Sequence, residues 1–166
     1  MAAVYRDYDQ AGLDAQYFLR GRIPDFQSFL DRYAARSKQV RETMPCRLDV
    51  AYGPSGPGET LDIFLPPEGR TPAPVHVFIH GGYWQMLDKS DHSFVAAGLV
   101  PHGAAVVVIN YDLAPKVSMD EIVRQCRAAL AWVWRNAASF GGDPNQICVS
   151  GHSAGGHLTA MMVSTD

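Results

Sequence analysis

The chain has 166 residues, which corresponds to one domain or to most of one. Apolar residues make up 47% and charged residues 19%, which is typical of a packed globular protein and excludes a disordered chain. With 17 acidic and 14 basic residues the formal charge is −3, so we expect no nucleic-acid partner, which normally requires a basic face.

Three cysteines, Cys46, Cys126 and Cys148, are too few and too scattered for a disulfide framework. A reduced, cytoplasmic setting is therefore expected. The N-terminus meets charge at Arg6 and contains no apolar core of a signal peptide. Residues 92–111 carry no charged side chain, but the Pro-His-Gly sequence that ends at Gly103 interrupts them. A helix, a turn and a buried strand explain this stretch better than a membrane span, so no membrane association is predicted.

Residues 1–45 form a polar segment that favours helix and is predicted to be an N-terminal helical cap. The sequence Arg-Gly-Arg-Ile-Pro at 20–24 breaks this segment. Beyond Asp25, apolar side chains recur at helical spacing: Phe26, Phe29, Leu30 and Tyr33. This pattern predicts an amphipathic helix that ends near Arg41 and packs over a core.

Residues 46–166 have a different sequence pattern, which predicts short strands separated by turns. Apolar and polar residues alternate over 46–52, as in a half-buried strand, and a second strand is predicted over 61–65. The Val- and Ile-rich sequences at 75–79 and 104–109 are typical of strands that are buried on both faces in a parallel sheet.

The clearest helix begins after Ser118, because Glu121 three residues later completes a capping-box pattern. One face of this helix is apolar: Ile122, Cys126, Leu130, Val133 and Ala137. Two glycines at 141–142 end the helical segment, and a strand over 147–150 and a helix over 154–163 follow. This order of elements predicts a single α/β domain over 46–166 with a mainly parallel sheet flanked by helices.

The sequence Gly-His-Ser-Ala-Gly at 151–155 matches the GxSxG motif of serine hydrolases. It follows a predicted strand and opens a predicted helix, which is the setting of a nucleophile elbow. The neighbours of the serine must be small because larger side chains would clash in so sharp a turn. Ser153 is therefore the candidate catalytic nucleophile, and the N-terminus of the helix can stabilise negative charge beside it.

A second motif, His-Gly-Gly-Tyr-Trp at 80–84, directly follows the predicted strand 75–79. The tetrahedral intermediate of acyl transfer carries negative charge on oxygen, and each preorganised donor there contributes about 3–4 kcal/mol. Glycines let the backbone approach the substrate closely. The candidate oxyanion hole comprises the backbone amides of Gly81, Gly82, Tyr83 and Ala154, although an ordinary glycine turn is the alternative.

Four sequences together, HGGYWQ (80–85), NYDLAP (110–115), FGGDP (140–144) and GHSAGGHL (151–158), resemble the α/β-hydrolase superfamily. Within it the chain is similar to the hormone-sensitive-lipase-like esterases and most similar to the arylformamidases, or kynurenine formamidases. The resemblance covers about 45–166, and the N-terminal segment is also similar to the cap of that family.

The resemblance implies a sheet of order 1-2-4-3-5-6-7-8, which would bring Gly82 and Ser153 to the same edge. It also implies a serine nucleophile, a histidine base and an aspartate, without any metal or organic cofactor. The substrate implied is a small acyl or formyl compound.

The acid and the base of this fold follow the serine in chain order, but only 13 residues follow Ser153. Among them are His157, expected to be a packing residue, and Asp166, too early for the acid of the family. We therefore expect a C-terminally truncated α/β-hydrolase fold without strands 6–8 and without the catalytic aspartate and histidine. Strand 147–150 would then be an open edge, which favours aggregation or a homo-oligomer.

Two aromatic residues after the glycines, Tyr83 and Trp84, either line an aryl-binding pocket or pack the loop against a lid. His80 is expected to brace the loop by hydrogen bonding, and Asp112 is expected to be a structural polar anchor. The other histidines show no metal-ligand spacing, so no metal is predicted: His76, His92, His102 and His152.

The function implied by the resemblance is hydrolysis of an aryl formamide such as N-formylkynurenine, a step of tryptophan catabolism, through an acyl-enzyme on Ser153. A carboxylesterase that acts on short-chain acyl esters is the nearest alternative, and Tyr83 and Trp84 favour the formamidase. A non-catalytic remnant that binds a partner is an alternative of another class, because the base and the acid are missing.

Overall fold

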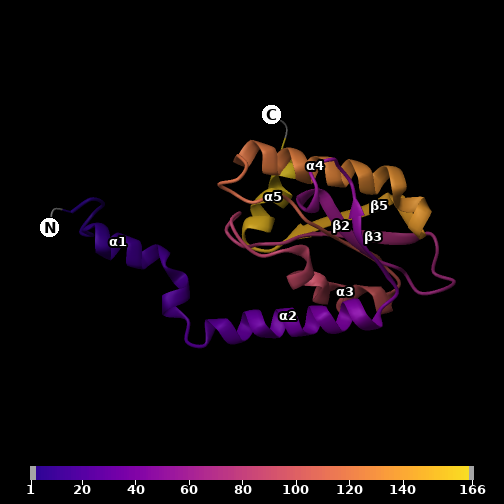
Figure 1. The fold of residues 1–166 in the computed structure, drawn as a ribbon, viewed down its shortest axis with the longest axis horizontal. Coiled ribbons are helices and arrows are strands. Elements are labelled where there is room, and N and C mark those ends of the chain that lie inside the picture. The colour runs from indigo at the N-terminus through magenta and orange to yellow at the C-terminus, as the bar shows by residue number, and fades with distance from the viewer. Residues whose placement is uncertain (1–2, 165–166) are drawn as a thin grey trace. The chain divides into compact units, whose positions relative to one another are not determined.

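The structure is a computed structural model in which residues 3–164 are described. It divides into two units, residues 3–32 and residues 33–164. The second unit contains a sheet of five strands flanked by helices (Figure 1).

The first unit has no core of its own. It contains helix α1 (Gln10–Tyr17), the 3₁₀ helix η1 (Leu19–Arg22) and the first turns of α2 (Phe26–Thr43). Asp9 caps α1 by accepting a hydrogen bond from the N–H of Gly12 at 2.8 Å. None of residues 3–32 is buried. The predicted amphipathic helix is confirmed and ends at Thr43.

The sheet has the order β1 (Cys46–Ala51), β2 (Thr60–Phe64), β4 (Ala105–Ile109), β3 (Ala73–Ile79), β5 (Gly142–Gly151). Strand β2 runs antiparallel to both of its neighbours, whereas β3 runs parallel to β4 and to β5. The sheet is therefore mixed, but four of its strands point the same way, as expected of a mainly parallel sheet. The order agrees with the first five positions that the resemblance implied.

One face of the sheet is covered by α4 (Met119–Asn136) and α5 (Ala154–Val163) (Figure 1). Most of its buried contacts are apolar. Its buried side chains include those of β3 and of both helices: Val75, Val77, Ile79, Ile122, Cys126, Val133 and Leu158. Burying one such aliphatic side chain contributes about 1.5–3 kcal/mol. This cluster holds the start of α5 against the end of β3.

The other face is covered by residues 33–43 of α2 and by short helices: η3 (Lys89–Val95), α3 (Ala96–Leu99) and η4 (Val100–His102). A smaller apolar cluster lies here: Val40, Phe64, Ala96, Val100, Val106 and Val108. The same face also buries charged and polar side chains, among them Asp62 and Lys89.

Two local predictions need correction. The strand predicted over 147–150 extends over Gly142–Gly151, because Gly142 pairs with Ala73 across an irregular register. Ser118 caps α4 by accepting the N–H of Glu121 at 3.2 Å, as predicted, but the carboxylate of Glu121 binds Arg124 at 2.7 Å. One half of the expected capping box is therefore present.

The uncharged stretch 92–111 contains short helices, a turn at Gly103 (φ +98°) and strand β4, as predicted. No helix within residues 3–164 is long and apolar enough to cross a membrane.

Candidate active site

The two motifs meet at one edge of the sheet. Strands β3 and β5 are parallel neighbours, and their last residues, Ile79 and Gly151, pair with each other. The N–H of His152 then donates to the carbonyl of Ile79 at 3.3 Å. A Cβ atom placed on Gly81 would lie 3.2 Å from the Cβ of Ser153. The glycine loop and the serine turn are therefore in direct contact.

Ser153 occupies a strained turn between β5 and α5. Its backbone angles, φ 55° and ψ −117°, lie in a region that strongly favours glycine, and such strain clusters at functional sites. The side chain of Ser153 is exposed and makes no capping bond to α5. A Cβ on Gly155 would lie 2.0 Å from the carbonyl oxygen of Ile79, so a larger residue there would separate α5 from β3. A strained strand-to-helix turn with an exposed serine is the geometry that a nucleophile elbow requires.

Within residues 3–164, none of the four backbone amides of the predicted oxyanion hole has a hydrogen-bond acceptor: Gly81, Gly82, Tyr83 and Ala154. The loop is closed from its other side, because the carbonyl of Gly82 accepts the N–H groups of Gln85 and Met86, both at 3.0 Å. Ala154 is the first residue of α5, so the positive end of the helix dipole also lies here.

The two aromatic residues of the loop have different environments. Tyr83 is 64% exposed, whereas Trp84 is half-buried and packs against the core cluster beneath α5. The rings of Trp84 and His157 meet edge to face at 5.3 Å, so His157 packs against the loop as expected. The carbonyl of Trp84 accepts the N–H of Ala114 at 2.8 Å.

His80 braces the glycine loop by hydrogen bonding, as expected. It is completely buried, with Nδ1 2.7 Å from the carbonyl oxygen of Gly81 and Nε2 3.0 Å from Oδ1 of Asn110. The ring of Tyr111 stacks on it at 4.2 Å, and the Tyr111 hydroxyl donates to the carbonyl of His80 at 2.8 Å. Sequence reasoning did not single out Asn110 or Tyr111 individually, although both lie in the quoted NYDLAP sequence.

Asp112 is a structural anchor, as expected. Its carboxylate accepts hydrogen bonds from Lys116 at 2.8 Å and from Gln125 at 3.0 Å. The bonds to Lys116 and Gln125 lower the pKa of Asp112. These contacts tie the segment after β4 to helix α4.

No general base is in place beside Ser153 in the described part of the chain. Among residues 3–164, no side chain is hydrogen-bonded to the Ser153 hydroxyl. No group of three or more His, Cys, Asp or Glu side chains in this part of the chain could hold a metal ion. Asp166 lies outside the described residues.

A family model named BD-FAE matches residues 61–166, which include the glycine loop and the elbow. The chain belongs to the BD-FAE family. This BD-FAE chain is 40% identical over 131 residues to kynurenine formamidase of Danio rerio, covering 79% of the chain and 42% of that relative. It is 35% identical over 134 residues to esterase LipQ of Mycobacterium tuberculosis, covering 78% of the chain and 29% of that relative.

Solved structures agree with these relatives. A crystal structure assigned as a thioesterase from Silicibacter sp. TM1040 matches with a TM-score of 0.74 and 38% identity, covering 85% of this chain and 51% of that one. Esterase B of Lactobacillus rhamnosis matches with a TM-score of 0.67 and 26% identity, covering 82% and 47%. The fold is thus that of a hormone-sensitive-lipase-like, arylformamidase-like α/β-hydrolase. The chain spans less than half the length of the curated relatives it matches.

Proposed function

We propose that this BD-FAE chain supplies the nucleophile and the oxyanion hole of a serine hydrolase that acts on small acyl or formyl substrates. The observation that carries the proposal is the contact between Ser153 and the glycine loop. An exposed hydroxyl on a strained turn lies beside the glycine loop, and the N–H groups of that loop and of Ala154 have no acceptor within residues 3–164.

In the proposed reaction, Oγ of Ser153 attacks the carbonyl carbon, and the carbonyl oxygen becomes an oxyanion that the free amides bind. The intermediate collapses to an acyl-serine when the bond to the leaving group breaks and the leaving group takes up a proton. Water then attacks the acyl-serine, which releases the carboxylic acid and restores the hydroxyl.

A general base must take the proton of the hydroxyl in the first step, because a neutral serine is a weak nucleophile. No described side chain is bonded to Ser153 in that role. We therefore expect this chain to react with activated electrophiles faster than it turns over an unactivated substrate.

An aryl formamide such as N-formylkynurenine is the proposed substrate, with formate and an amine as products. The kynurenine formamidases of Danio rerio and Salmo salar, each 40% identical to this chain, support it. The exposed ring of Tyr83 beside the oxyanion donors offers an aromatic contact.

A short-chain acyl ester is the second candidate substrate, and esterase relatives such as LipQ and carboxylesterase NlhH of Mycobacterium tuberculosis support it. A non-catalytic, partner-binding role is the alternative of another class, because no side chain within residues 3–164 is hydrogen-bonded to the Ser153 hydroxyl.

A fluorophosphonate probe separates the hydrolase from the non-catalytic alternative. We expect mass spectrometry to find the adduct on Ser153 and the Ser153→Ala variant to remain unlabelled. Ser150→Ala is the matched control, because Ser150 lies on β5 just before the turn and its hydroxyl is 2.8 Å from Nε2 of His76. A folded chain that stays unlabelled would overturn the nucleophile assignment. Parallel assays with N-formylkynurenine and p-nitrophenyl acetate then rank the two substrate classes.

A further inference from the structure

The carboxamide of Asn110 is held in one orientation behind the glycine loop. Its Nδ2 donates to Oδ2 of Asp88 at 2.8 Å and to the carbonyl of Pro57 at 3.2 Å. Its Oδ1 accepts the N–H of Lys89 at 3.3 Å. A flipped carboxamide would set its oxygen against two acceptors and its nitrogen against a donor, so Oδ1 must face His80.

His80 consequently meets an acceptor at each ring nitrogen. The carbonyl oxygen of Gly81 lies 2.7 Å from Nδ1, and Oδ1 of Asn110 lies 3.0 Å from Nε2. A neutral imidazole has one N–H and one lone pair. In either tautomer, the unprotonated ring nitrogen of His80 would therefore lie within hydrogen-bond distance of an oxygen with no proton between them. The doubly protonated ring satisfies both contacts.

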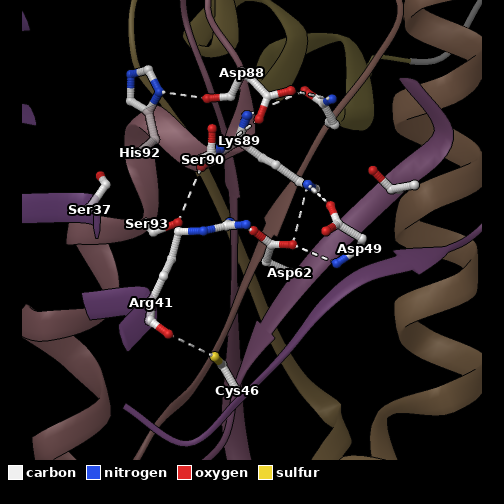
Figure 2. A network of polar contacts seen from close by, with 12 residues as sticks. Ser37, Arg41, Cys46, Asp49, Asp62, Asp88, Lys89, Ser90, His92 and Ser93 are labelled. Carbon is white, nitrogen blue, oxygen red and sulfur yellow. Dashed lines mark hydrogen bonds and ion pairs between the residues drawn. The ribbon is translucent and has the colours of Figure 1, made fainter. Parts of the chain in front are cut away.

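The ion network that contacts Asn110 has an excess of carboxylate, and Asp88 and Asp91 are its members that act on His80. The linked network of Figure 2 contains the carboxylates of Asp49, Asp62 and Asp88 and the cations of Arg41 and Lys89. Asp91, in the same capping box as Asp88, adds a further carboxylate nearby. A cation at His80 therefore offsets a charge that the network leaves unbalanced.

Burial and hydrogen bonding act on His80 in opposite directions. Burial lowers the pKa of His80 below its ordinary value and outweighs the bonds to Gly81 and Asn110 and the carboxylates of Asp88 and Asp91, which raise it. The acceptors at both ring nitrogens are what favours the second proton. On the ring faces lie Tyr111, stacked at 4.2 Å, and His92, stacked at 5.8 Å. Burial lowers the pKa of His92 to about 4, so His92 is neutral near pH 6.

The bond from His80 to Gly81 has a consequence at Gly82. The carbonyl of Gly81 and the N–H of Gly82 belong to one planar trans peptide, so they point in opposite directions. Holding the carbonyl oxygen fixes the direction of the N–H. A donor on the carbonyl also polarises the peptide and strengthens its N–H as a donor.

We propose that Asn110 and Asp88 are positioning residues that, through a His80 donating from both ring nitrogens, aim the N–H of Gly82 at the oxyanion. The effect on the oxyanion rests on the proposed serine hydrolase function. The hydrogen-bonding state of His80 does not depend on it.

The state of His80 is tested directly on the wild-type chain by ¹⁵N NMR of the histidine rings at pH 6. We expect two slowly exchanging ring N–H protons on His80, one at each nitrogen. One N–H together with an unprotonated ring nitrogen at this pH would overturn the proposal. This measurement needs no variant, so it decides the proposal even where a substitution prevents folding.

The positioning role is tested by removing the carboxylate at position 88 and then by placing one at position 110. Asp88→Asn removes the carboxylate, so we expect a lower pKa of His80 and phosphonate labelling of Ser153 slowed roughly tenfold, less than the ~10²–10³ lost with a whole oxyanion donor. The double variant Asp88→Asn/Asn110→Asp again pairs an amide donor with a carboxylate between positions 88 and 110 and keeps an acceptor for His80, but it loses the bond to the carbonyl of Pro57. We expect it to restore the His80 pKa and part of the labelling rate.

Asn145→Ala, which removes an exposed asparagine on β5, is the matched control and should label at the wild-type rate. A merely structural role predicts that the double variant is worse than either single variant, with no return of the His80 pKa. If wild-type Ser153 is not labelled at all, the proposed function fails and the ring protons of His80 still decide this inference. If Asp88→Asn labels like wild type with an unchanged His80 pKa, the inference fails and the proposed function stands.

Discussion

The two faces of the sheet are buried by different physical means. Beneath α4 and α5 the contacts are mainly apolar and non-directional, and polar bonds such as that of Gln125 to Asp112 lie at the margin of the cluster. Beneath α2 and η3 a smaller apolar cluster lies beside an ion network, in which Asp62 is 0% and Lys89 is 4% exposed. The apolar face holds the serine turn at the end of β3. The polar face reaches the glycine loop through directional bonds from Asp88, Asn110 and His80.

The position of Ser153 and the orientation of the peptide groups beside it therefore depend on different interactions. Apolar packing places Ser153 next to Gly81, but it cannot orient a peptide group. The hydrogen-bonded face can do so, because each of its bonds has a donor, an acceptor and an angle. Substitutions on the two faces should therefore differ in how much free energy of unfolding they cost. They should also differ in whether the loss depends on pH.

The largest effect is expected on the polar face for Asp62→Ala. Asp62 pairs with Arg41 and with Lys89, and removing it leaves two largely buried cations without this partner. Breaking such a pair costs about 3–5 kcal/mol of the free energy of unfolding, to be measured by urea denaturation. Asp120→Ala, at an exposed first-turn position of α4, should cost less than about 1 kcal/mol. Equal losses in the two variants would contradict the ion network.

On the apolar face, Leu158→Ala should cost about 3 kcal/mol, because it opens a cavity between α5 and the sheet. Val163→Ala, near the end of the same helix and 85% exposed, should cost less than about 0.5 kcal/mol. The same denaturation experiment compares them. A loss below about 1 kcal/mol for Leu158→Ala would show that α5 is not held by this packing.

A pH-dependent effect is expected at His92, on the polar face. Burial lowers its pKa in the folded chain to about 4, whereas the unfolded value is about 6.5. The unfolded chain therefore binds more protons between these values, so stability is full above about pH 6.5 and falls as the pH drops towards 4. The difference amounts to about 3 kcal/mol.

His92→Phe should remove this part of the pH dependence, as followed by denaturation at pH 7 and pH 4. His102→Gln, at an exposed histidine, should retain the wild-type dependence. If both variants lose the same stability on acidification as the wild type, another group is responsible.

The smallest effect is a gain. Ser153→Gly should raise the free energy of unfolding by about 1 kcal/mol, because glycine tolerates the positive φ of the turn. Ser139→Gly, in the 3₁₀ helix η5 (Ala137–Phe140), should instead cost about 0.5–1 kcal/mol. Thermal unfolding of both variants checks the signs, and a loss at Ser153 would mean that the turn is not strained.

Periodicity and turn chemistry predicted most of the elements. The helix expected over 154–163 is found at those residues, and the strands begin and end near their predicted positions. The early start of β5 was missed because it depends on pairing with Ala73, and register between distant segments leaves no local pattern.

Short motifs indicate candidate site residues from the sequence, as at Ser153 and Gly82, and their chemical roles stay predictions. The residues that hydrogen-bond to the glycine loop could not be predicted, because they come from distant parts of the chain. Asn110 directly follows β4, and Asp88 is the N-cap of η3, after the glycine loop. Asp49, which also contacts Lys89, adopts a positive φ of 55° that no sequence pattern indicates.

The central claim is that the Ser153 hydroxyl and the free amides of the glycine loop enclose one oxyanion position. A crystal structure of the chain after phosphonylation of Ser153 tests it most directly. We expect the phosphoryl oxygen to lie about 3 Å from the backbone nitrogen of Ala154 and from that of Gly82 or Tyr83. A phosphoryl oxygen that points to solvent, with those amides directed elsewhere, would contradict the claim.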